Sequence, residues 1–461
     1  MPSPEAPRVT PRDRDAIDAS LPGAPAYLPN PRRIIWPTVA TAVLLLGKLF
    51  PLPELRDALN GLVFDGGRLS YSNAYIAFSP LYDLLDAMAL LTVQQHYGLI
   101  GSVLLAWLFI RWRMASGAPG AARWLHELRS LAIVLASIVA LYAFGVFVPR
   151  PMARLRVYDT DIAVVDVHSH TNASHDGRRG FDVEANRAWH AAAGFDVSYV
   201  SEHLSADGVK SWREVERGLK ANPVHAGDAT VIATAIEAHS GTEHVIILGA
   251  TARDMDMFDA PDHLRANARL STGAVPVVIQ TIPGTLANFA RSGIDTLLPS
   301  IAIEVNDAAP RGLAQNLRDR PLITRMVDSL NLATVAASDN HGWGRTAASW
   351  TLVRVPGWRG LPGDTVAARI EEIIRTRRRL SVRAIERRTP QVGPRVSELI
   401  LTVPLMLWEM NATLGPQQRL SWLVWTWGIA HFGPLLRAAV IRRRNKRLAA
   451  AAAAAPAADV A

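Results

Sequence analysis

Long apolar segments alternate with polar loops at both ends of the chain, and these segments predict membrane-spanning helices. Ser130–Val148 holds nineteen residues without a charge. Such a helix crosses about 30 Å of hydrocarbon, because each residue adds about 1.5 Å. Ile34–Phe50, Ala87–Ile110 and Leu420–Ile441 are also predominantly apolar. We therefore predict four spanning helices.

Two apolar segments have alternative interpretations. Ile34–Phe50 could be a secretory signal peptide, but 33 residues precede it and no small-residue cleavage pattern follows Phe50. These features favour a span. Leu399–Trp408 has only ten residues between two glutamates, which favours an interfacial helix or strand over a span.

The basic residues of the short loops predict an orientation. Residues 1–33 hold five Arg, residues 111–129 hold four, and residues 442–447 hold five basic side chains, whereas residues 51–86 hold two Arg. Because basic loops stay cytoplasmic, residues 149 to about 395 are expected outside. A span at Leu399–Trp408 would reverse this placement. We expect an integral protein of a bacterial inner membrane with an extracytoplasmic soluble domain.

The expected organisation has six parts. They are a polar tail, a three-helix transmembrane region, a hydrolase-like domain, a connector with an interfacial segment, a last span and a basic Ala-rich tail, at residues 1–33, 34–148, 155–392, 393–419, 420–441 and 442–461.

Composition narrows the chemistry. The 461 residues include no Cys, which excludes disulfides, thiolate nucleophiles and Cys-ligated zinc. The mean hydropathy of +0.11 is high for a purely soluble protein. Most of the net charge of +8 flanks apolar segments, and no basic-aromatic stripe is present. We therefore expect a lipid bilayer as partner and no nucleic acid.

The central part of the chain has a different pattern. From Asp161 to about Arg388, short β-branched runs alternate with helix-like stretches such as Asp182–Ala193, stopped by Gly194, and Ala314–Leu330. This alternation predicts an α/β domain with a mainly parallel sheet, either doubly wound or a βα barrel. The predicted strands are Ile162–Val167, Val197–Val200, Thr230–Ile236, Val245–Leu248, Val275–Ile279, Ile301–Val305 and Thr334–Ala337.

Ten of the thirteen His lie in this domain, several of them directly after strands. His168 and His170 are two residues apart in an extended segment, so both can face one metal ion. The other groups expected at strand ends are His203, Glu237, His244, Asp339 and His341. The carboxyl ends of strands form the rim where barrels build active sites. The ordered set therefore predicts a metal site.

These motifs resemble those of a known family. DVHSHTNASHDG, AWHAAAGFD, VSYVSEH, IEAHSGTEHVIILG and ASDNHGWG follow one another in the order typical of the polymerase and histidinol phosphatase (PHP) superfamily. The resemblance covers about 230 residues and implies a distorted seven-stranded βα barrel, here flanked by transmembrane helices. It also implies two or three divalent metal ions, and hydrolysis of a phosphoester by a metal-bridging hydroxide.

Site residues are carried over by motif. The resemblance implies metal binding by His168, His170, Asp176, His203, Glu237, His244, Asp339 and His341. Asp176, Glu237 and Asp339 would also take part in catalysis. Imidazole and carboxylate ligands suit Zn, Mn or Fe. Arg345 is our candidate for gripping a phosphate of a small-molecule or envelope substrate, because its guanidinium can hold two oxygens.

Two departures from the family pattern leave alternatives open. Ser174-His175-Asp176-Gly177 has one residue inserted, so either His175 or Asp176 could be the ligand, and the Asp-Gly pair favours Asp176. Where the family has a His before Pro, this chain has Ile282, which cannot ligate a metal; Gln280 is a weak substitute.

Other polar residues of the domain receive weaker predictions. We expect His190 at the surface or in packing, Glu304 in packing or an internal salt bridge, and Asn306 and Asp307 in substrate positioning. His239 is a candidate for supporting the ligands. Two functional alternatives remain beside the phosphoesterase: a non-catalytic sensor or scaffold that binds metal or a phosphorylated ligand, and an amidohydrolase-like enzyme.

Overall fold

The computed structural model describes residues 31–114, 121–203, 208–240, 243–254, 269–281, 301–393 and 395–453. Contacts divide the chain into two compact units. One unit spans Leu46–Trp422, and the other is formed by the segments on either side of it. The sheet, the predicted site and most of the helices belong to Leu46–Trp422.

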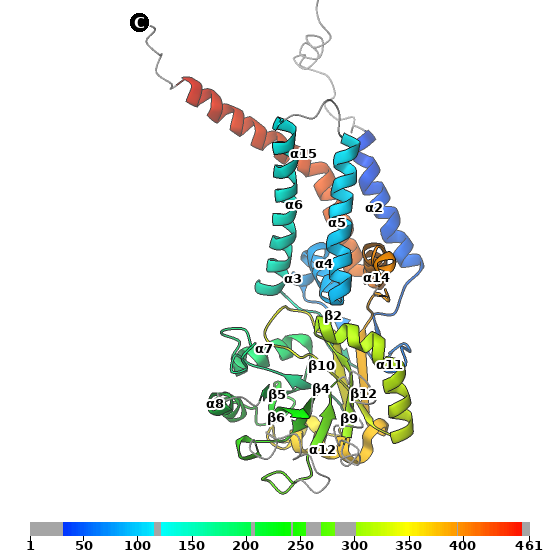
Figure 1. The fold of residues 1–461 in the computed structure, drawn as a ribbon, viewed down its shortest axis with the longest axis vertical. Coiled ribbons are helices and arrows are strands. Elements are labelled where there is room, and N and C mark those ends of the chain that lie inside the picture. The colour runs from blue at the N-terminus through cyan, green and yellow to red at the C-terminus, as the bar shows by residue number, and fades with distance from the viewer. Residues whose placement is uncertain are drawn as a thin grey trace, which may run out of the picture. The chain divides into compact units, whose positions relative to one another are not determined.

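Helices dominate both ends of the chain (Figure 1). Their bounds are α2 Pro31–Leu49, α3 Asn73–Ala77, α4 Ser79–Ala89, α5 Val93–Met114, α6 Ala121–Phe147, α13 Val396–Leu399, α14 Thr402–Thr413 and α15 Pro416–Ala453. Within the described part of the chain, two stretches are long and apolar enough to cross a membrane, Val93–Met114 and Arg123–Phe147. Almost none of their residues is buried, as lipid-facing helices require. Ile34–Leu49 is a shorter apolar helix.

The four predicted spans therefore have unequal support. The segments within α5 and α6 meet the requirements of length and hydropathy, whereas the spans at Ile34–Phe50 and Leu420–Ile441 stay predictions. Leu399–Trp408 is helical over most of its length, within α14.

Ten strands form one mixed sheet in the order β1-β12-β11-β4-β5-β6-β7-β8-β9-β10. Their bounds are β1 Leu55–Asp57, β4 Ile162–Ser169, β5 Val197–His203, β6 Val231–Ser240, β7 Glu243–Leu248, β8 Val277–Gln280, β9 Ile301–Asp307, β10 Ala333–Ala337, β11 Ser349–Arg354 and β12 Val382–Arg387. A second, two-stranded sheet pairs β2 Gly67–Ser70 with β3 Arg154–Val157.

All seven predicted strands are present, but the expected count of seven and the mainly parallel sheet are wrong. Only four neighbouring pairs run parallel: β4 with β5, β5 with β6, β8 with β9, and β9 with β10. β7 is antiparallel to both of its neighbours, and β11 to β4 and β12. Because β7 follows β6 after only two residues, a crossover helix cannot fit between them and the chain must turn back.

The sheet curls so that the segment after β10, the last strand in its order, lies beside β4. The segment after β10 bonds to the end of β4: the His170 amide donates to the Asn340 carbonyl at 2.9 Å, and the Asp339 amide donates to the His168 carbonyl at 3.0 Å. Ser169 and Asn340 form a parallel bridge. This closure places the segment that carries His168 and His170 beside the segment that carries Asp339 and His341.

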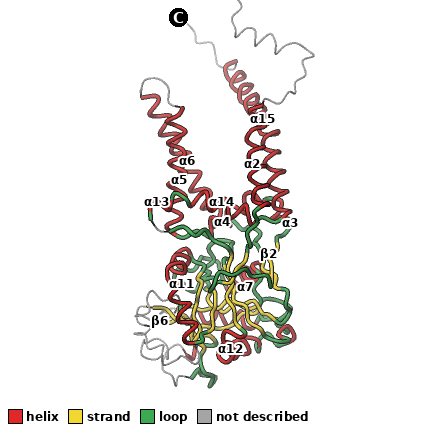
Figure 2. The backbone as a smooth tube through the Cα atoms, turned by 90° about the vertical axis from the view of Figure 1, so that its right-hand side faces the viewer, coloured by secondary structure: helices red, strands yellow, loops and turns green. Residues whose placement is uncertain are grey.

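Helices and short turns flank the curled sheet (Figures 1 and 2). They are α7 Val183–Ala193, α8 Gly208–Lys220, α11 Pro310–Leu330 and α12 Val366–Arg377, with 3-10 turns at Ala252–Asp254, Trp358–Gly360 and Arg378–Leu380. The ends of α7 agree with prediction. The Asp182 side chain accepts from the Ala185 amide at its start, and Gly194 ends it at φ 93°, a conformation that glycine adopts without strain.

Buried aliphatic residues from the strands fill the interior of the curled sheet. Val165, Val197, Ile246 and Val335 are fully buried members of this core. The strands therefore bury apolar side chains along much of their length, although Asp166 of β4 and Glu304 of β9 are buried polar residues inside strands. The core fixes the strands that present the site.

A buried aspartate joins the helical region to the sheet. Asp86 on α4 accepts from Arg150 at 2.7 Å, from Thr346 at 2.8 Å and from Arg387 of β12 at 2.9 Å. The side chains of Asp86 and Arg150 are each only 1% exposed. Charge-assisted bonds of this kind are strong and directional, so α4 is held against the segment that follows β10.

Burial of Glu371 on α12 predicts a pH-dependent stability. Tyr199 donates to Glu371 at 3.3 Å, and burial raises the pKa of Glu371 from 4.5 to about 7. A raised folded-state pKa means that stability is complete below 4.5 and is lost as the pH rises through about 7. The loss amounts to about 3 kcal/mol at most.

Glu371→Gln removes this titration while keeping an acceptor for Tyr199. We expect the variant to be about 1–3 kcal/mol more stable than the wild type above pH 7, with little difference below pH 4.5. Thermal unfolding of the purified protein across this range measures the effect. Glu372→Gln, on the same helix but half-exposed, is the control; equal curves for all three proteins would contradict the prediction.

Candidate metal centre

The structure gathers the predicted ligands at one edge of the sheet. His168 is the last residue but one of β4, which ends at Ser169, and His170 follows directly after the strand. His203 is the last residue of β5 and lies in register with Glu237 on β6. His244 was expected at a strand end but lies near the start of β7. It reaches the same edge because β7 runs antiparallel to β6.

Four candidate ligand atoms lie close to one another. His168 Nε2 lies 3.1 Å from His170 Nε2, 3.4 Å from Glu237 Oε2 and 3.3 Å from Asp339 Oδ1. His170 Nε2 lies 3.2 Å from the same Glu237 atom and 3.4 Å from the same Asp339 atom. A tetrahedron whose corners are about 2.1 Å from a central metal has edges of about 3.4 Å. The five separations given above are therefore close to those of ligands around a single ion, and His168, His170 and Glu237 form the tightest group.

Glu237 Oε2 is the buried atom whose surroundings most clearly fit a bound cation. This oxygen is buried and has no hydrogen-bond partner among the described residues. Imidazole nitrogens of His168, His170 and His203 nevertheless approach it to 3.1–3.4 Å. An unsatisfied buried carboxylate oxygen is costly. A metal ion shared by Glu237 and the imidazoles would satisfy it.

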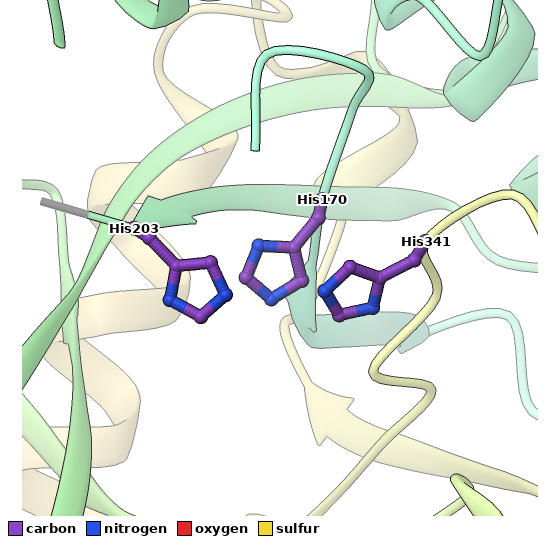
Figure 3. A group of neighbouring side chains, drawn as sticks. All are labelled: His170, His203 and His341. Atoms are coloured by element: carbon purple, nitrogen blue, oxygen red, sulfur yellow. The ribbon is translucent and has the colours of Figure 1, made fainter. Parts of the chain in front are cut away.

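A second group of ligands adjoins the first. Figure 3 shows the His170 imidazole between those of His203 and His341, with ring centroids 4.7 and 4.1 Å away. Asp176 Oδ1 lies 3.1 Å from His341 Nε2 and 3.8 Å from His203 Nε2. His341 Nε2 is itself buried without a hydrogen-bond partner among the described residues. Asp176, His203 and His341 therefore form a candidate second site.

The remaining predicted ligands lie at the margin of the cluster. His175, Asp176 and His203 have ligand atoms within 4.8 Å of one another, and so do His203, Glu237 and His244. Both residues of the His175-Asp176 alternative are therefore near the cluster. Asp176 also lies 3.1 Å from His341, which keeps it the preferred ligand.

The charges of the cluster are interdependent. Burial opposes a charge on His168 and His170, but Asp339 and Glu237 outweigh it. They raise the pKa of His168 well above its usual value and that of His170 to about 9. Burial likewise opposes charge on Glu237, but His168, His170 and His244 hold its pKa well below its usual range. Protons and metal ions compete for these nitrogens, so metal binding should weaken as the pH falls.

His203 shows the opposite shift. Burial lowers its pKa to about 4, and the neighbouring His170 and His341 also lower it. The imidazole is therefore neutral near neutral pH. Neutral imidazole is the form that binds a metal.

Glu304 lies behind the candidate ligand His168, which the sequence did not indicate. This fully buried residue of β9 places Oε2 at 3.4 Å from His168 Nδ1, on the ring edge that faces away from Glu237 and Asp339. A carboxylate behind a metal-binding imidazole fixes its orientation and tautomer. The predicted internal salt bridge agrees with this contact, and its partner is the candidate ligand His168.

His190 is also tied to the site instead of lying at the surface. Its Nε2 lies 2.8 Å from Asp166 Oδ2, and both side chains are fully buried. Asp166 also accepts from the amides of His168, at 3.2 Å, and Ser338, at 3.1 Å. Asp166 thus links the two segments that carry His168 and Asp339.

Asp339 has a left-handed backbone, with φ of 45°. Such a conformation is uncommon outside glycine, although Asp and Asn tolerate it best. The bond from its amide to His168 holds it in place. Strained backbone of this kind is concentrated at functional sites, in agreement with a ligand role for Asp339.

The other predicted site residues have varied positions. Arg345 lines a cavity of about 550 Å³ together with Asp176, Asp339 and His341. Asn306 instead donates to Glu386, in a buried network that includes Arg320, which gives it a structural contact in place of the expected substrate contact.

Three further positions lie at or near Ile282, where the PHP pattern has a histidine. The side-chain amide of Gln280 is buried, and neither its nitrogen nor its oxygen has a hydrogen-bond partner among the described residues. Ile282 lies outside the described residues, and so does the side chain of His239. The consequence of Ile282 for metal count stays a prediction.

Comparisons with known proteins give only distant likenesses. No family model matches the chain, and no curated protein matches it. Among solved structures, PsfC from Pseudomonas syringae is 20% identical with a TM-score of 0.34, over 55% of this chain and 99% of PsfC.

Two other solved structures are similar over about half of the chain. One is a two-domain protein from Bacteroides vulgatus containing a predicted PHP-like metal-dependent phosphoesterase, 13% identical with a TM-score of 0.30, over 50% of this chain and 68% of that protein. The other is an amidohydrolase from Chromobacterium violaceum, 14% identical with a TM-score of 0.25, over 51% and 99%. At these scores, none establishes the function of this chain.

The position of Glu304 generates a prediction about metal affinity. Glu304→Gln keeps the shape of the side chain but removes the charge behind His168. We expect the affinity for Mn²⁺ or Zn²⁺ to fall by about 10–100-fold, the usual effect of losing such a support. Competition with a chromogenic chelator measures the change.

The control for Glu304→Gln is Asp228→Asn, at a carboxylate whose side chain is 66% exposed. Its metal affinity should equal that of the wild type. An unchanged affinity in Glu304→Gln, with an intact fold, would show that Glu304 does not support a metal ligand.

Proposed function

We propose that the protein is a membrane-anchored, metal-dependent phosphoesterase. The observation that carries the proposal is the buried Glu237 oxygen, approached by three imidazole nitrogens without a hydrogen bond. Mixed imidazole and carboxylate ligands suit Zn, Mn or Fe. His168, His170, Glu237 and Asp339 would hold one ion. Asp176, His203 and His341 would hold a second.

The metals and the residues contribute differently. Bound divalent ions would make water nucleophilic near neutral pH and offset negative charge on the phosphoryl group. In the hydrolysis, an oxygen of water bonds to phosphorus, the ester P–O bond breaks, and the leaving oxygen receives a proton. Glu237 and Asp339 provide the fixed negative charge that retains the cations.

Arg345 is the residue that we propose binds the substrate. It lines the same cavity as Asp339 and His341 and is half-buried. Among the described residues, no carboxylate lies within ion-pair distance of Arg345. Its guanidinium can therefore bind phosphate oxygens without first breaking an ion pair, and it can do so with two parallel hydrogen bonds.

Metal content and turnover test the proposal together. We expect the purified protein to bind two or more divalent ions and to hydrolyse a chromogenic phosphomonoester or phosphodiester. Asp339→Asn preserves side-chain shape and tolerates the left-handed backbone. It should lower kcat by at least about 100-fold, the scale for losing one charge-stabilising group, and His170→Ala should do the same.

His225→Ala is the matched control, since this His has a side chain that is 59% exposed and should leave metal content and turnover unchanged. Metal binding without turnover of either ester would favour the non-catalytic sensor. Absence of bound metal would contradict both functions.

A further inference from the structure

A cavity of about 550 Å³ extends from the metal centre to the helical region, and all of its lining belongs to the unit Leu46–Trp422. Its volume lies within the range of about 300–1,000 Å³ that small-molecule sites occupy. The two ends of the cavity differ in chemistry. That difference indicates what kind of molecule fits.

One wall is mainly apolar and comes from α4 and α6; the polar groups near it, His96 of α5 and the Tyr142 hydroxyl, pair with each other at 2.8 Å. Leu85, Met88 and Ala89 line this wall from α4, at spacings that put them on one helix face. α6 contributes Leu141, Tyr142, Gly145 and Val146 from its last two turns, again on one face. Gly145 matters for the approach of these helices, because a Cβ there would lie 3.2 Å from Leu85 Cδ2.

Other residues of the lining carry the polar and charged groups. Asp176, Asp339 and His341 are among them, and each is a candidate metal ligand. Arg150 and Arg345 lie on the same cavity, with Arg345 Nε donating to the Arg150 carbonyl at 3.3 Å. Asp86 neutralises Arg150 at 2.7 Å, so Arg345 is the cation available for a phosphate.

We infer that the substrate is a phosphorylated lipid, with its phosphoester at the metal centre and an aliphatic chain against α4 and α6. The inference rests on the proposed phosphoesterase function and adds the class of its substrate. A hydrophilic ester such as a sugar phosphate would leave polar groups without partners against this apolar wall, which is unfavourable. An alkyl chain would gain free energy by burial there.

The helix α6 indicates that the lipid would come from the membrane. Arg123–Phe147 is one of the two stretches that are long and apolar enough to cross a membrane, and its last turns form the cavity wall. A lipid can therefore pass from the bilayer to the cavity along an apolar surface. Free short-chain phosphates lack this advantage, so the preferred substrate is a membrane lipid.

Chain-length dependence tests the inference. The full-length protein in phosphatidylcholine nanodiscs with Mn²⁺ is given butyl, octyl and dodecyl phosphates, and the matching alkyl 4-nitrophenyl phosphates, below their critical micelle concentrations. Each methylene that becomes buried contributes enough to raise kcat/KM by up to about threefold. We expect dodecyl esters to exceed butyl esters by at least about tenfold.

A cavity-filling variant separates this cavity from general hydrophobicity. Val146→Phe adds volume to the apolar wall and keeps the Val146 carbonyl that accepts from the Gly344 amide at 3.2 Å. The dodecyl-to-butyl ratio of kcat/KM should fall by at least about fivefold. Val139→Phe is the control, because Val139 is on the same helix, 67% exposed and outside the cavity lining. Its ratio should equal that of the wild type.

The outcomes distinguish the two proposals. Turnover that does not depend on chain length, or a ratio unchanged by Val146→Phe, would overturn the lipid inference and leave the phosphoesterase standing. If no ester is hydrolysed, the phosphoesterase fails, and the inference is judged by binding alone. Isothermal titration with dodecyl and butyl phosphate should then give tighter dodecyl binding that Val146→Phe weakens, and equal affinities would overturn it.

Discussion

A buried carboxylate surrounded by imidazoles is the constraint on which the site depends. Glu237 is 5% exposed, and one of its oxygens faces nitrogens of His168, His170 and His203 without a hydrogen bond. A buried charge is stable only when it is paired. The imidazoles can pair with it either as protonated cations or as ligands of a shared metal. Their spacing agrees with the second arrangement, which also explains why Asp339 approaches the same nitrogens.

The fold brings these residues together by closing the sheet. β4 and the segment after β10 are separated by more than 160 residues, yet two backbone hydrogen bonds join them at His168 and His170. Asp166 strengthens the same junction through Ser338. On the far side of this segment, Asp86 binds Thr346 and so connects α4 to the site. The cavity is therefore lined by both the helical region and the segment that carries the candidate ligands, so a change in α4 or α6 should alter the candidate metal centre.

Local patterns in the sequence were sufficient to predict many of the strands, the ends of α7 and part of the candidate site. The β-branched runs identified seven strands, because buried strands require such residues at short intervals. Asp182 and Gly194 predicted the ends of α7. The alternation of His168 and His170 placed both imidazoles on one side of β4. Each of these features depends on residues close together in the chain.

Features that depend on distant residues could not be predicted. The direction of β7 follows from its pairing with β6 and β8, so the sequence did not reveal why His244 reaches the rim. Nothing near Glu304 or His190 indicates their partners, which lie on β4 far away in sequence. β11 pairs antiparallel with β4, and β12 pairs antiparallel with β11, so both extend the sheet beyond the predicted strands. The cavity is lined by residues from α4, α6 and the segment that ends at Thr346, which are far apart in the sequence.

X-ray absorption spectroscopy of the purified full-length protein tests the central claim most directly, because it reports the atoms bound to a metal. The account predicts nitrogen and oxygen ligands at about 2.0–2.2 Å, scattering from imidazole rings, and a second metal at about 3.5–4 Å. Asp339→Asn should change this spectrum, whereas His225→Ala should not. A metal surrounded only by water oxygens, or a protein that retains no metal, would contradict the account.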